Sequence, residues 1–510
     1  MDTKALRQKI LDLAIRGKLV PQDPNEEPAS VLLEKIRAEK QQMVKDGRLK
    51  TKDIKNDTII FKGEDNLHYE KFQDGSVKCI EDEIPFEVPE GWAWCRLKHV
   101  CTMAAGKAKP TDQIMTEPFE GCYPCFGGNG IRGYVDEYNQ HGIFSIVGRQ
   151  GALCGNINIA KGKFYATEHA IVTTLFSGID FNWSNYVLEA LQLNSYATGA
   201  AQPGLSVANV LNVFVPVPPT QEQVHIGIRI AESIKIIENI EDEKENLQTL
   251  ISSAKSKILD LAIRGKLVPQ NPNDEPASVL LERIRAEKEE LIKAGKIKRD
   301  KKESIIFKGD DNSYYEKVGA EIRCIDSEIP FKIPDGWMYE RLGNICSIAR
   351  GGSPRPIENY LTDDENGLNW IKIGDTEQGG KYIYSTKEKI RPEGLSKTRY
   401  VCSGDFLLTN SMSFGRPYIL RTNGCIHDGW LVIGGIEIAF HQDYLYYMLS
   451  SSIMYNALSS LAVGSTVKNL KSDSVKSLLV PIPPLAEQAC ISRQIENYFA
   501  TMLPIERSLS

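Results

Sequence analysis

Two long segments of this chain carry arginine, asparagine, glutamine and lysine among glycine-rich turns, and these residue types can read nucleic-acid bases. Arginine forms paired hydrogen bonds with guanine, asparagine and glutamine form them with adenine, and amides in glycine turns bind phosphate. For any single residue, a turn or surface role is the simpler alternative. The candidates are Asn129, Arg132, Tyr134, Arg149, Gln150, Lys163, Thr167, His169 and Gln202 in the first segment, and Arg350, Ser353, Arg355, Lys372, Asn410, Ser411, Ser413 and Arg416 in the second.

Motifs for enzymatic chemistry are missing from the sequence. It contains no GxxxxGK[ST] phosphate loop, no HExxH and no GxSxG. Gly128, Gly130 and Gly133 formally satisfy GxGxxG, but no apolar strand precedes them and no amphipathic helix follows, so we reject a dinucleotide site. His169 and His427 lack neighbouring ligands or nucleophiles and are expected to be ordinary hydrogen-bonded histidines. We therefore expect no catalytic residue and no bound cofactor in this chain.

The cysteines also argue against a metal site. Cys122 and Cys125 form a CxxC, but no second pair follows at the spacing that zinc requires. Cys79 and Cys324 occupy matching places in an internal repeat, which favours packing over chemistry. Eleven scattered cysteines do not resemble a secreted disulfide framework, so we expect a reducing cytoplasm.

Length and charge set further limits. A chain of 510 residues predicts about three compact units. No run approaches the ~20 apolar residues of a membrane helix, and the N-terminus lacks the apolar core of a signal peptide. The net charge of -6 does not fit a protein that grips nucleic acid by bulk charge. Any DNA-binding surface must therefore be local or supplied by partners.

The two candidate segments are inserts in a repeated frame. Residues 9–40 and 257–288 differ at three of 32 positions, and the similarity continues to Trp92 and Trp337. It stops over residues 97–205 and 342–466, which cannot be aligned, and it returns at NVFVPVPPTQEQ and SLLVPIPPLAEQ. A period of ~250 residues is too long for a solenoid, so a whole domain with its connector is duplicated. The chain is thus expected to be pseudo-two-fold.

Apolar residues between positions 224 and 261 recur at three- and four-residue steps, which predicts one long amphipathic helix ending near Gly265. Its narrow apolar stripe requires a partner, and we expect Ile228, Ile237, Leu247 and Ile258 to take part in docking. The segments after Pro28 and Pro276 predict a second, shorter helix in each repeat, and the basic stretches that follow are expected to be solvated loops.

The two ends of the chain complete the frame. Aligning Gln488 with Gln223 and Lys9 with Lys257 leaves only positions 246–248 of the long helix without a counterpart. Helices over about 485–509 and 3–16 would together rebuild the second copy of that helix. We therefore predict that the two termini lie close together and pack antiparallel to the central helix.

An insert followed by VPVPPTQEQ or VPIPPLAEQ and a long helix, twice over, resembles the type I restriction-modification specificity subunits. EGWAW and DGWMY ahead of the inserts, GGSPRP at the head of the second, and IVGRQGALCGN and LLTNSMSFGRP within them add to the likeness. The resemblance covers nearly the whole chain. Its one departure is a C-terminal helix that stops early, so that the frame depends on the N-terminal segment.

This resemblance implies an α+β fold with two globular target recognition domains separated by a pair of long antiparallel helices. The implied boundaries are 1–50, 51–217, 218–295, 296–482 and 483–510, alternating conserved helical segments with the two recognition domains. It also implies a bipartite, asymmetric DNA site. Two methyltransferase subunits would dock on the helices and motor-nuclease subunits would join them, with S-adenosylmethionine, ATP and Mg²⁺ held by those partners. A protein-binding scaffold and a stand-alone methyltransferase are the alternatives.

Overall fold

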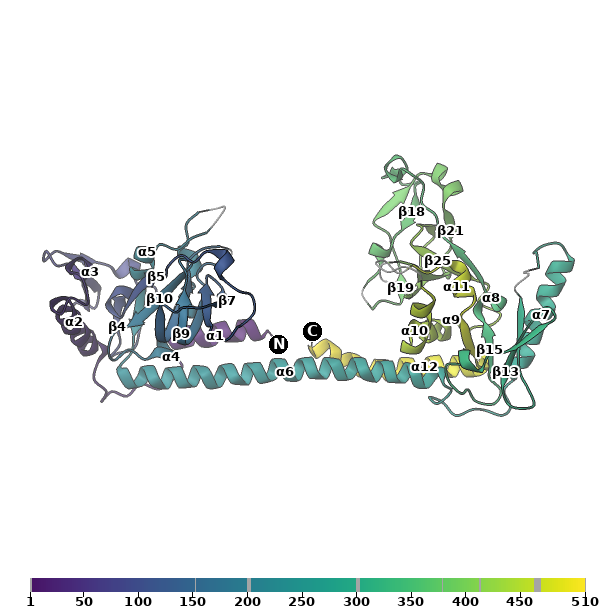
Figure 1. The fold of residues 1–510 in the computed structure, drawn as a ribbon, viewed down its shortest axis with the longest axis horizontal. Helices are drawn as coiled ribbons and strands as arrows, with labels where there is room; N and C mark the ends of the chain where they lie inside the picture. Colours follow the sequence, from purple (N-terminus) through teal and green to yellow (C-terminus); the bar gives the residue numbers. More distant parts are fainter. Residues whose placement is uncertain are drawn as a thin grey trace. The chain divides into compact units, whose positions relative to one another are not determined.

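The computed structural model describes residues 2–151, 153–199, 203–299, 303–377, 379–411, 414–462 and 469–509. The chain divides into two compact units, residues 1–244 and 245–510, and each is described by itself (Figure 1). Two candidate residues, Gln202 and Ser413, lie outside the described residues. Among the residues described, no helix is long and apolar enough to cross a membrane.

The predicted long helix is α6 (Thr220–Ile263). It begins directly after Pro218-Pro219, because proline is accepted at the start of a helix but disfavoured in its interior. It ends in a Schellman motif, in which the amide of Gly265 donates to Ala262 O and that of Lys266 donates to Leu261 O. Gly265 has a φ of +65°, and a Cβ there would lie 2.3 Å from Cγ of Pro334. Only glycine fits this end of the helix.

In the first unit, α1 (Thr3–Ile15) packs against the first part of α6. Arg7 lies 3.8 Å from Glu238, whereas Gln22 lies 3.1 Å from Glu222, so the two segments run antiparallel. Leu11 and Ala14 of α1 are buried in one core with Ile226 and Ile230 of α6. This core extends into the variable domain through α4 (Phe181–Ala190).

In the second unit, the C-terminal helix α12 (Leu485–Leu509) packs on the last part of α6, also antiparallel. Nζ of Lys255 lies 2.6 Å from Glu506 and stacks over the Phe499 ring, while Gln248 reaches Leu509 O. Each terminal helix therefore packs on α6 within its own unit. The prediction that the two ends meet concerns both units and stays a prediction.

The predicted shorter helices are α2 (Ala29–Lys45) and α7 (Ala277–Lys293), and both are confirmed. A small antiparallel sheet follows each helix. The basic stretch after α2 contains one further turn of helix, α3 (Thr51–Ile54), which was not predicted. The small sheets are β1 (Ile59–Lys62), β2 (His68–Lys71) and β3 (Val77–Cys79), and β12 (Ser304–Lys308), β13 (Tyr314–Val318) and β14 (Glu321–Cys324).

A two-stranded ribbon closes each variable domain at its base, where β4 (Ala93–Arg96) pairs with β11 (Phe214–Val217) and β15 (Met338–Arg341) pairs with β26 (Leu479–Ile482). The ribbon brings together the GW motif and the EQ motif, which is Glu222-Gln223 in the first copy and Glu487-Gln488 in the second. The indole N–H of Trp92 donates to Glu222 at 3.0 Å and that of Trp337 donates to Glu487 at 2.8 Å. These buried contacts explain why both motifs recur in the two copies.

The variable domains contain strands between turns, as predicted. The first holds one six-stranded sheet, in the order β5-β10-β8-β9-β6-β7, and the second holds two five-stranded sheets, β16-β25-β22-β23-β19 and β17-β20-β18-β24-β21. The strands of the first are β5 (Cys101–Ala105), β6 (Tyr123–Gly127), β7 (Gly130–Val135), β8 (Gln140–Gly148), β9 (Ile157–Ala166) and β10 (Ala170–Leu175).

The strands of the second domain include β16 (Ser347–Arg350), β22 (Phe406–Thr409) and β25 (Trp430–Gly434), whose antiparallel order matches that of β5, β8 and β10. Helix α9 (Gln442–Ser450) follows them as α4 follows β10. The others are β17 (Leu361–Thr362), β18 (Leu368–Ile371), β19 (Tyr382–Ile383), β20 (Glu388–Ile390), β21 (Arg399–Val401), β23 (Pro417–Leu420) and β24 (Gly424–Ile426). The α+β fold class is confirmed.

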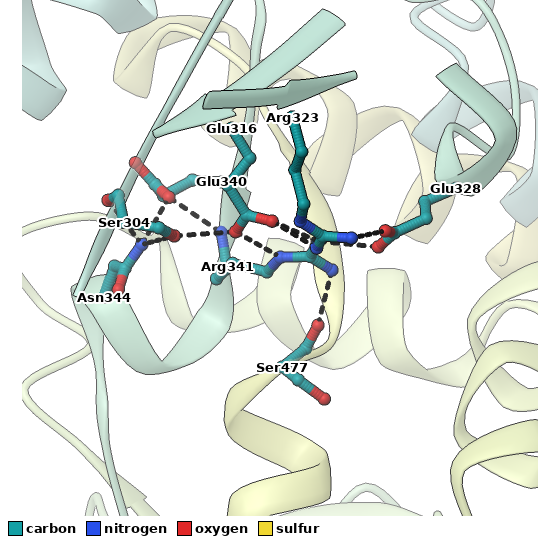
Figure 2. A network of polar contacts seen from close by, with 8 residues as sticks. All are labelled: Ser304, Glu316, Arg323, Glu328, Glu340, Arg341, Asn344 and Ser477. Carbon is teal, nitrogen blue, oxygen red and sulfur yellow. Dashed lines mark hydrogen bonds and ion pairs between the residues drawn. The ribbon is translucent and has the colours of Figure 1, made fainter. Parts of the chain in front are cut away.

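A buried ion pair fastens each small sheet to its ribbon. Arg341 holds Glu316 with two hydrogen bonds, of 3.0 and 2.9 Å, and also contacts Glu328 and the carbonyl oxygen of Ser477 (Figure 2). In the first unit, Arg96 holds Glu70 in the same two-pronged manner, at 2.8 and 2.6 Å. The hydrogen bond from Arg341 lowers the pKa of Glu316 to about 2. Both carboxylates are therefore ionised at neutral pH.

The packing role expected for Cys79 and Cys324 is not seen within this chain. Both thiols are exposed, because each lies on an edge strand of its small sheet, opposite Tyr69 and Tyr315. Cys125 is buried and Cys122 is half-buried.

Candidate nucleic-acid interface

Three loops of each variable domain come together through matching backbone hydrogen bonds. In the first unit, the amide of Gly106 donates to Ala170 O, and that of Arg149 donates to His169 O. In the second unit, Gly351 donates to Trp430 O and Asn410 donates to Gly429 O. We name these loops the reading loops: residues 106–110, 149–151, 153–156 and 167–169 in the first unit, and 351–356, 410–411, 414–416 and 427–429 in the second.

These hydrogen bonds align two inserts that their sequences do not align. Arg149 and Asn410 occupy equivalent positions, since each also accepts a backbone hydrogen bond of 2.8 Å, from Leu205 and from Leu470. Glu168 and Asp428 are likewise equivalent, because each precedes by two residues the strand residue that Gly106 or Gly351 contacts. The framework of the reading loops is shared, whereas its side chains differ.

The glycines that begin the first reading loop are required by close backbone contact. A Cβ on Gly106 would lie 2.1 Å from Ala166 O, and one on Gly351 would lie 2.2 Å from His427 O. No side chain fits at these distances. The turn of the β6–β7 hairpin joins the first surface in a similar way, since a Cβ on Gly128 would lie 3.0 Å from Gln150 O.

In the first unit, the reading loops present a mixture of cationic and amide side chains. Arg149 donates to the carbonyl oxygen of Glu168 at 3.3 Å, and Nε2 of His169 lies 3.3 Å from the Glu168 carboxylate. Asn129 is exposed and accepts a hydrogen bond of 2.9 Å from Asn156. The backbone of the exposed Gln150 forms an isolated antiparallel β-bridge with Gly204. Donors and acceptors for base edges thus lie on one surface.

Arg132 lies on β7 and reaches the same region from the side. Its Nη2 donates to Thr111 Oγ1 at 2.9 Å, just after the first reading loop. The exposed Lys107 within that loop forms no ion pair with the described residues. Lys109 is paired with Glu137 at 2.9 Å. Lys107, Arg132 and Arg149 thus place three cationic side chains at the first surface, although the whole chain is acidic.

In the second unit, four predicted residues converge on one acidic residue, Asp428. Arg350 and Asn410 donate to its carbonyl oxygen at 2.9 and 2.8 Å. Ser353 and Arg355 contact its carboxylate at 2.7 and 3.2 Å. Burial alone would raise the pKa of Asp428, but the hydrogen bond from Ser353 helps to bring it below its ordinary value. The carboxylate is thus ionised and holds the first reading loop in place.

Lys372 and His427 complete the second surface. The amide of Ile373, next to Lys372, lies 3.2 Å from Nε2 of His427, and Lys372 itself pairs with Glu388. Burial lowers the pKa of His427, so its ring is neutral near pH 7. The amide of Gly429 lies 2.7 Å from its Nδ1. This histidine orders the turn that carries Asp428.

Two candidate side chains, those of Thr167 and Asn410, do not face solvent in the way that base reading requires. Thr167 and Asn410 are fully buried, and Thr167 donates to Phe126 O at 2.9 Å. The exposed Lys163, on β9, lies over the ring of Tyr138. The backbone of Tyr134 pairs with that of Met115. Ser411 and Arg416 lie in the second reading loop, half-buried and exposed respectively. Thr167 and Asn410 therefore shape the surface rather than read from it.

Other residues of this surface were missed by sequence reasoning. Lys107 and Arg399 are exposed, and Nε of Arg399 donates to Arg350 O. Glu168 and Asp428 were overlooked because acidic residues were not sought at a site for an anion. Lys107 could not be found from the sequence, since the match of Gly106 with Gly351 appears only in their backbone hydrogen bonds.

The docking residues predicted on α6 fall into two groups. Ile228 and Leu247 are 52% and 39% exposed, whereas Ile237 is 1% exposed and Ile258 packs against the core of the second unit. Ile237 is therefore not free to dock a partner. Ile236 and Leu250, at 59% and 65% exposed, are apolar positions of α6 that were not selected.

Comparison with known proteins identifies the frame and the inserts together. The family model for the type I restriction modification DNA specificity domain matches residues 89–249 and 334–509. The EcoEI specificity subunit of Escherichia coli is 27% identical, over 97% of this chain and 89% of that protein. The EcoprrI specificity subunit of Escherichia coli is 41% identical over 31% of this chain and 38% of its own.

A solved chain from work on complex assembly and conformational transition of the type I R-M system shares the fold. It aligns with a TM-score of 0.51 and 16% identity, over 83% of this chain and 94% of that one. The two family matches contain both sets of reading loops, both ribbons and most of α6 and α12. The chain belongs to the type I restriction-modification DNA specificity subunits.

Proposed function

We propose that this chain selects the DNA sequence on which a type I restriction-modification complex acts, with each variable domain reading one half of a bipartite, asymmetric site. One observation carries the proposal. The two sets of reading loops share a backbone framework, yet equivalent positions hold Arg149 and His169 in one unit and Asn410 and Gly429 in the other. Equivalent frameworks with unlike side chains suit two different half-sites.

The local charge of these surfaces supports the proposal. Lys107, Arg132 and Arg149 lie on or beside the reading loops of the first unit, and Arg350, Arg355 and Arg399 lie on or beside those of the second. Cationic side chains at these places can hold phosphate while their neighbours meet base edges. Cationic side chains are thus available locally although the net charge of the chain is -6.

In this function the chain is a non-catalytic subunit. Two methyltransferase subunits would dock on it, with exposed apolar residues of α6 such as Ile228 and Leu250 available to them. Motor-nuclease subunits would complete the complex. S-adenosylmethionine, ATP and Mg²⁺ would be bound by these partners.

The test is protection of DNA by the complex reconstituted from the chain and its methyltransferase subunit. Sequence-dependent protection, lost when either half-site is altered, is the expected result. Protection without sequence dependence would favour an assembly scaffold. Methylation of specific DNA by the purified chain alone would favour a stand-alone methyltransferase.

A further inference from the structure

The small sheets β1–β3 and β12–β14 each turn an apolar face to solvent. In the first unit, Ile59 pairs with Lys71 and Lys71 with Val77, while Phe61 pairs with Tyr69 and Tyr69 with Cys79. Alternate residues of a strand share a face, so these six side chains form one surface, which we name the outer face. Ile59, Phe61 and Val77 are 38%, 41% and 52% exposed.

The second unit repeats this outer face residue by residue. Its members are Ile305, Phe307, Tyr315, Lys317, Ile322 and Cys324, in the same register. Five of the six residue types are identical, and the sixth changes only from Val77 to Ile322. The aromatic pairs stack alike, with ring centroids 5.9 Å apart in Phe61–Tyr69 and 5.8 Å apart in Phe307–Tyr315.

The opposite face of each sheet is the one that fastens it to its unit. Glu70 and Glu316 point inward to Arg96 and Arg341, as Figure 2 shows for the second unit. The outer face is therefore not needed to hold the sheet in place. Large exposed apolar surfaces on a rigid element are typical of contacts with another protein.

The repetition indicates what kind of partner covers this surface. The reading loops differ between the two units, as unlike DNA half-sites require, whereas the outer faces are the same. An unchanged surface on both units fits a partner that is itself present twice. We propose that each outer face docks one copy of the methyltransferase subunit, and this inference rests on the function proposed above.

The chemistry of the outer face describes the matching surface on the partner. Aliphatic and aromatic side chains surround one lysine in each copy, Lys71 or Lys317, and neither lysine forms an ion pair with the described residues. A complementary surface would be apolar and would carry a carboxylate opposite that lysine. Such a contact adds to docking on α6, where other apolar residues are exposed.

Thiol labelling tests this proposal on the unaltered protein. The exposed Cys79 and Cys324 lie on the outer faces, whereas Cys402 is exposed elsewhere in the second unit and serves as the control. Maleimide labelling is followed by peptide mass spectrometry, with and without the methyltransferase subunit. Labelling of Cys79 and Cys324 should be lost in the complex while that of Cys402 continues. Equal labelling of the three thiols in the complex would overturn the proposal.

Charged substitutions provide the second test, read as subunit stoichiometry by native mass spectrometry. Ile59→Glu with Val77→Glu should leave one bound methyltransferase subunit instead of two, and adding Ile305→Glu with Ile322→Glu should leave none. Ile143→Glu, at a residue 56% exposed on β8, is the matched control and should retain both. Thermal unfolding of each variant checks that the sheets remain folded.

The outcomes separate this proposal from the function on which it rests. If the fourfold variant binds two methyltransferase subunits, the outer faces are not the docking surface, while the proposed function stands. The same holds if that variant loses only DNA protection, or if the free chain is a dimer that the variant makes monomeric. If the unaltered chain binds no methyltransferase subunit, both proposals fail.

Discussion

The frame has the same contact in both units: the indole of Trp92 donates to Glu222, and that of Trp337 donates to Glu487. In the reading loops, by contrast, one equivalent backbone position holds Arg149 in the first unit and Asn410 in the second. The frame contacts are buried, so each partner constrains the other and both copies keep the pair. The reading loops are fixed mainly through backbone hydrogen bonds, which leave their side chains free to differ. This contrast explains how one scaffold carries two unlike surfaces.

The largest expected effect concerns the ion pairs of the frame. Arg96→Ala would leave the buried Glu70 without its ion-pair partner, which costs about 3–5 kcal/mol, whereas Arg341→Ala would leave Glu316 paired only with the more exposed Arg323. Hydrogen exchange should show early opening of β12–β14 or β1–β3 in the respective variant, with the other unit unaffected. Arg323→Ala is the control, since its side chain is 57% exposed and should cost about 0–1 kcal/mol. Similar losses from Arg323 and Arg341 would contradict the buried anchor.

The next effect concerns base reading. Arg149→Ala should lower discrimination at one position of the first half-site by about 1–3 kcal/mol, because a paired hydrogen bond to a base is lost. Competition binding of the reconstituted complex to DNA variants measures this. The second half-site should be read as before, and Lys163→Ala should change little. Loss of discrimination at both half-sites would refute the independence of the two surfaces.

A smaller effect is expected at the acidic residue of the second surface. Asp428→Asn removes the partner of Arg355 and one negative charge, so non-specific DNA affinity should rise by less than about tenfold, with weaker selection at the second half-site. Glu168→Gln is the matched variant in the first unit and should affect only that half. Salt titration of binding separates charge from specificity. If Asp428→Asn changes neither non-specific DNA affinity nor selection at the second half-site, Asp428 does not position the reading loop.

The smallest expected effect concerns how acid changes the stability of the small sheet β12–β14. The pKa of Glu316 is lowered to about 2 from an ordinary 4.5, so its contribution is present above pH 4.5 and is lost as the pH falls toward 2. The pKa of Glu70 is also lowered: burial acts to raise it, but the hydrogen bonds from Arg96 and Thr58 and the nearby positive charges together outweigh burial. Glu316→Gln should flatten the acid dependence of hydrogen exchange in β12–β14 alone. If hydrogen exchange in β12–β14 depends on acidic pH equally in the variant and the unaltered chain, the prediction is contradicted.

Much of the frame could be predicted from sequence, because its signals are local. The long helix α6 was predicted from three signals: the spacing of its apolar residues, the prolines before it and Gly265 after it. The repeat itself located the inserts. The exposure of Cys79 and Cys324 could not be predicted, because it depends on which face of a three-stranded sheet is anchored by Glu70 and Glu316.

The candidate site was predicted only in its residue types. The predicted residues Arg149, Ser353 and Arg355 lie in the reading loops, and their contact with DNA stays a prediction. Pattern reasoning also selected Thr167 and Asn410, which are buried, because burial in a turn is set by contacts with distant strands. The equivalence of Arg149 with Asn410 was invisible, since it rests on backbone hydrogen bonds and not on side-chain similarity.

On the proposed function, each variable domain reads its own half-site on a common frame. The most direct test replaces residues 97–205 with the insert of another specificity subunit and sequences the methylated sites in cells that carry the hybrid. We predict a motif in which one half changes and the other is retained. An unchanged motif, or the loss of both halves in a complex that still assembles, would contradict this account.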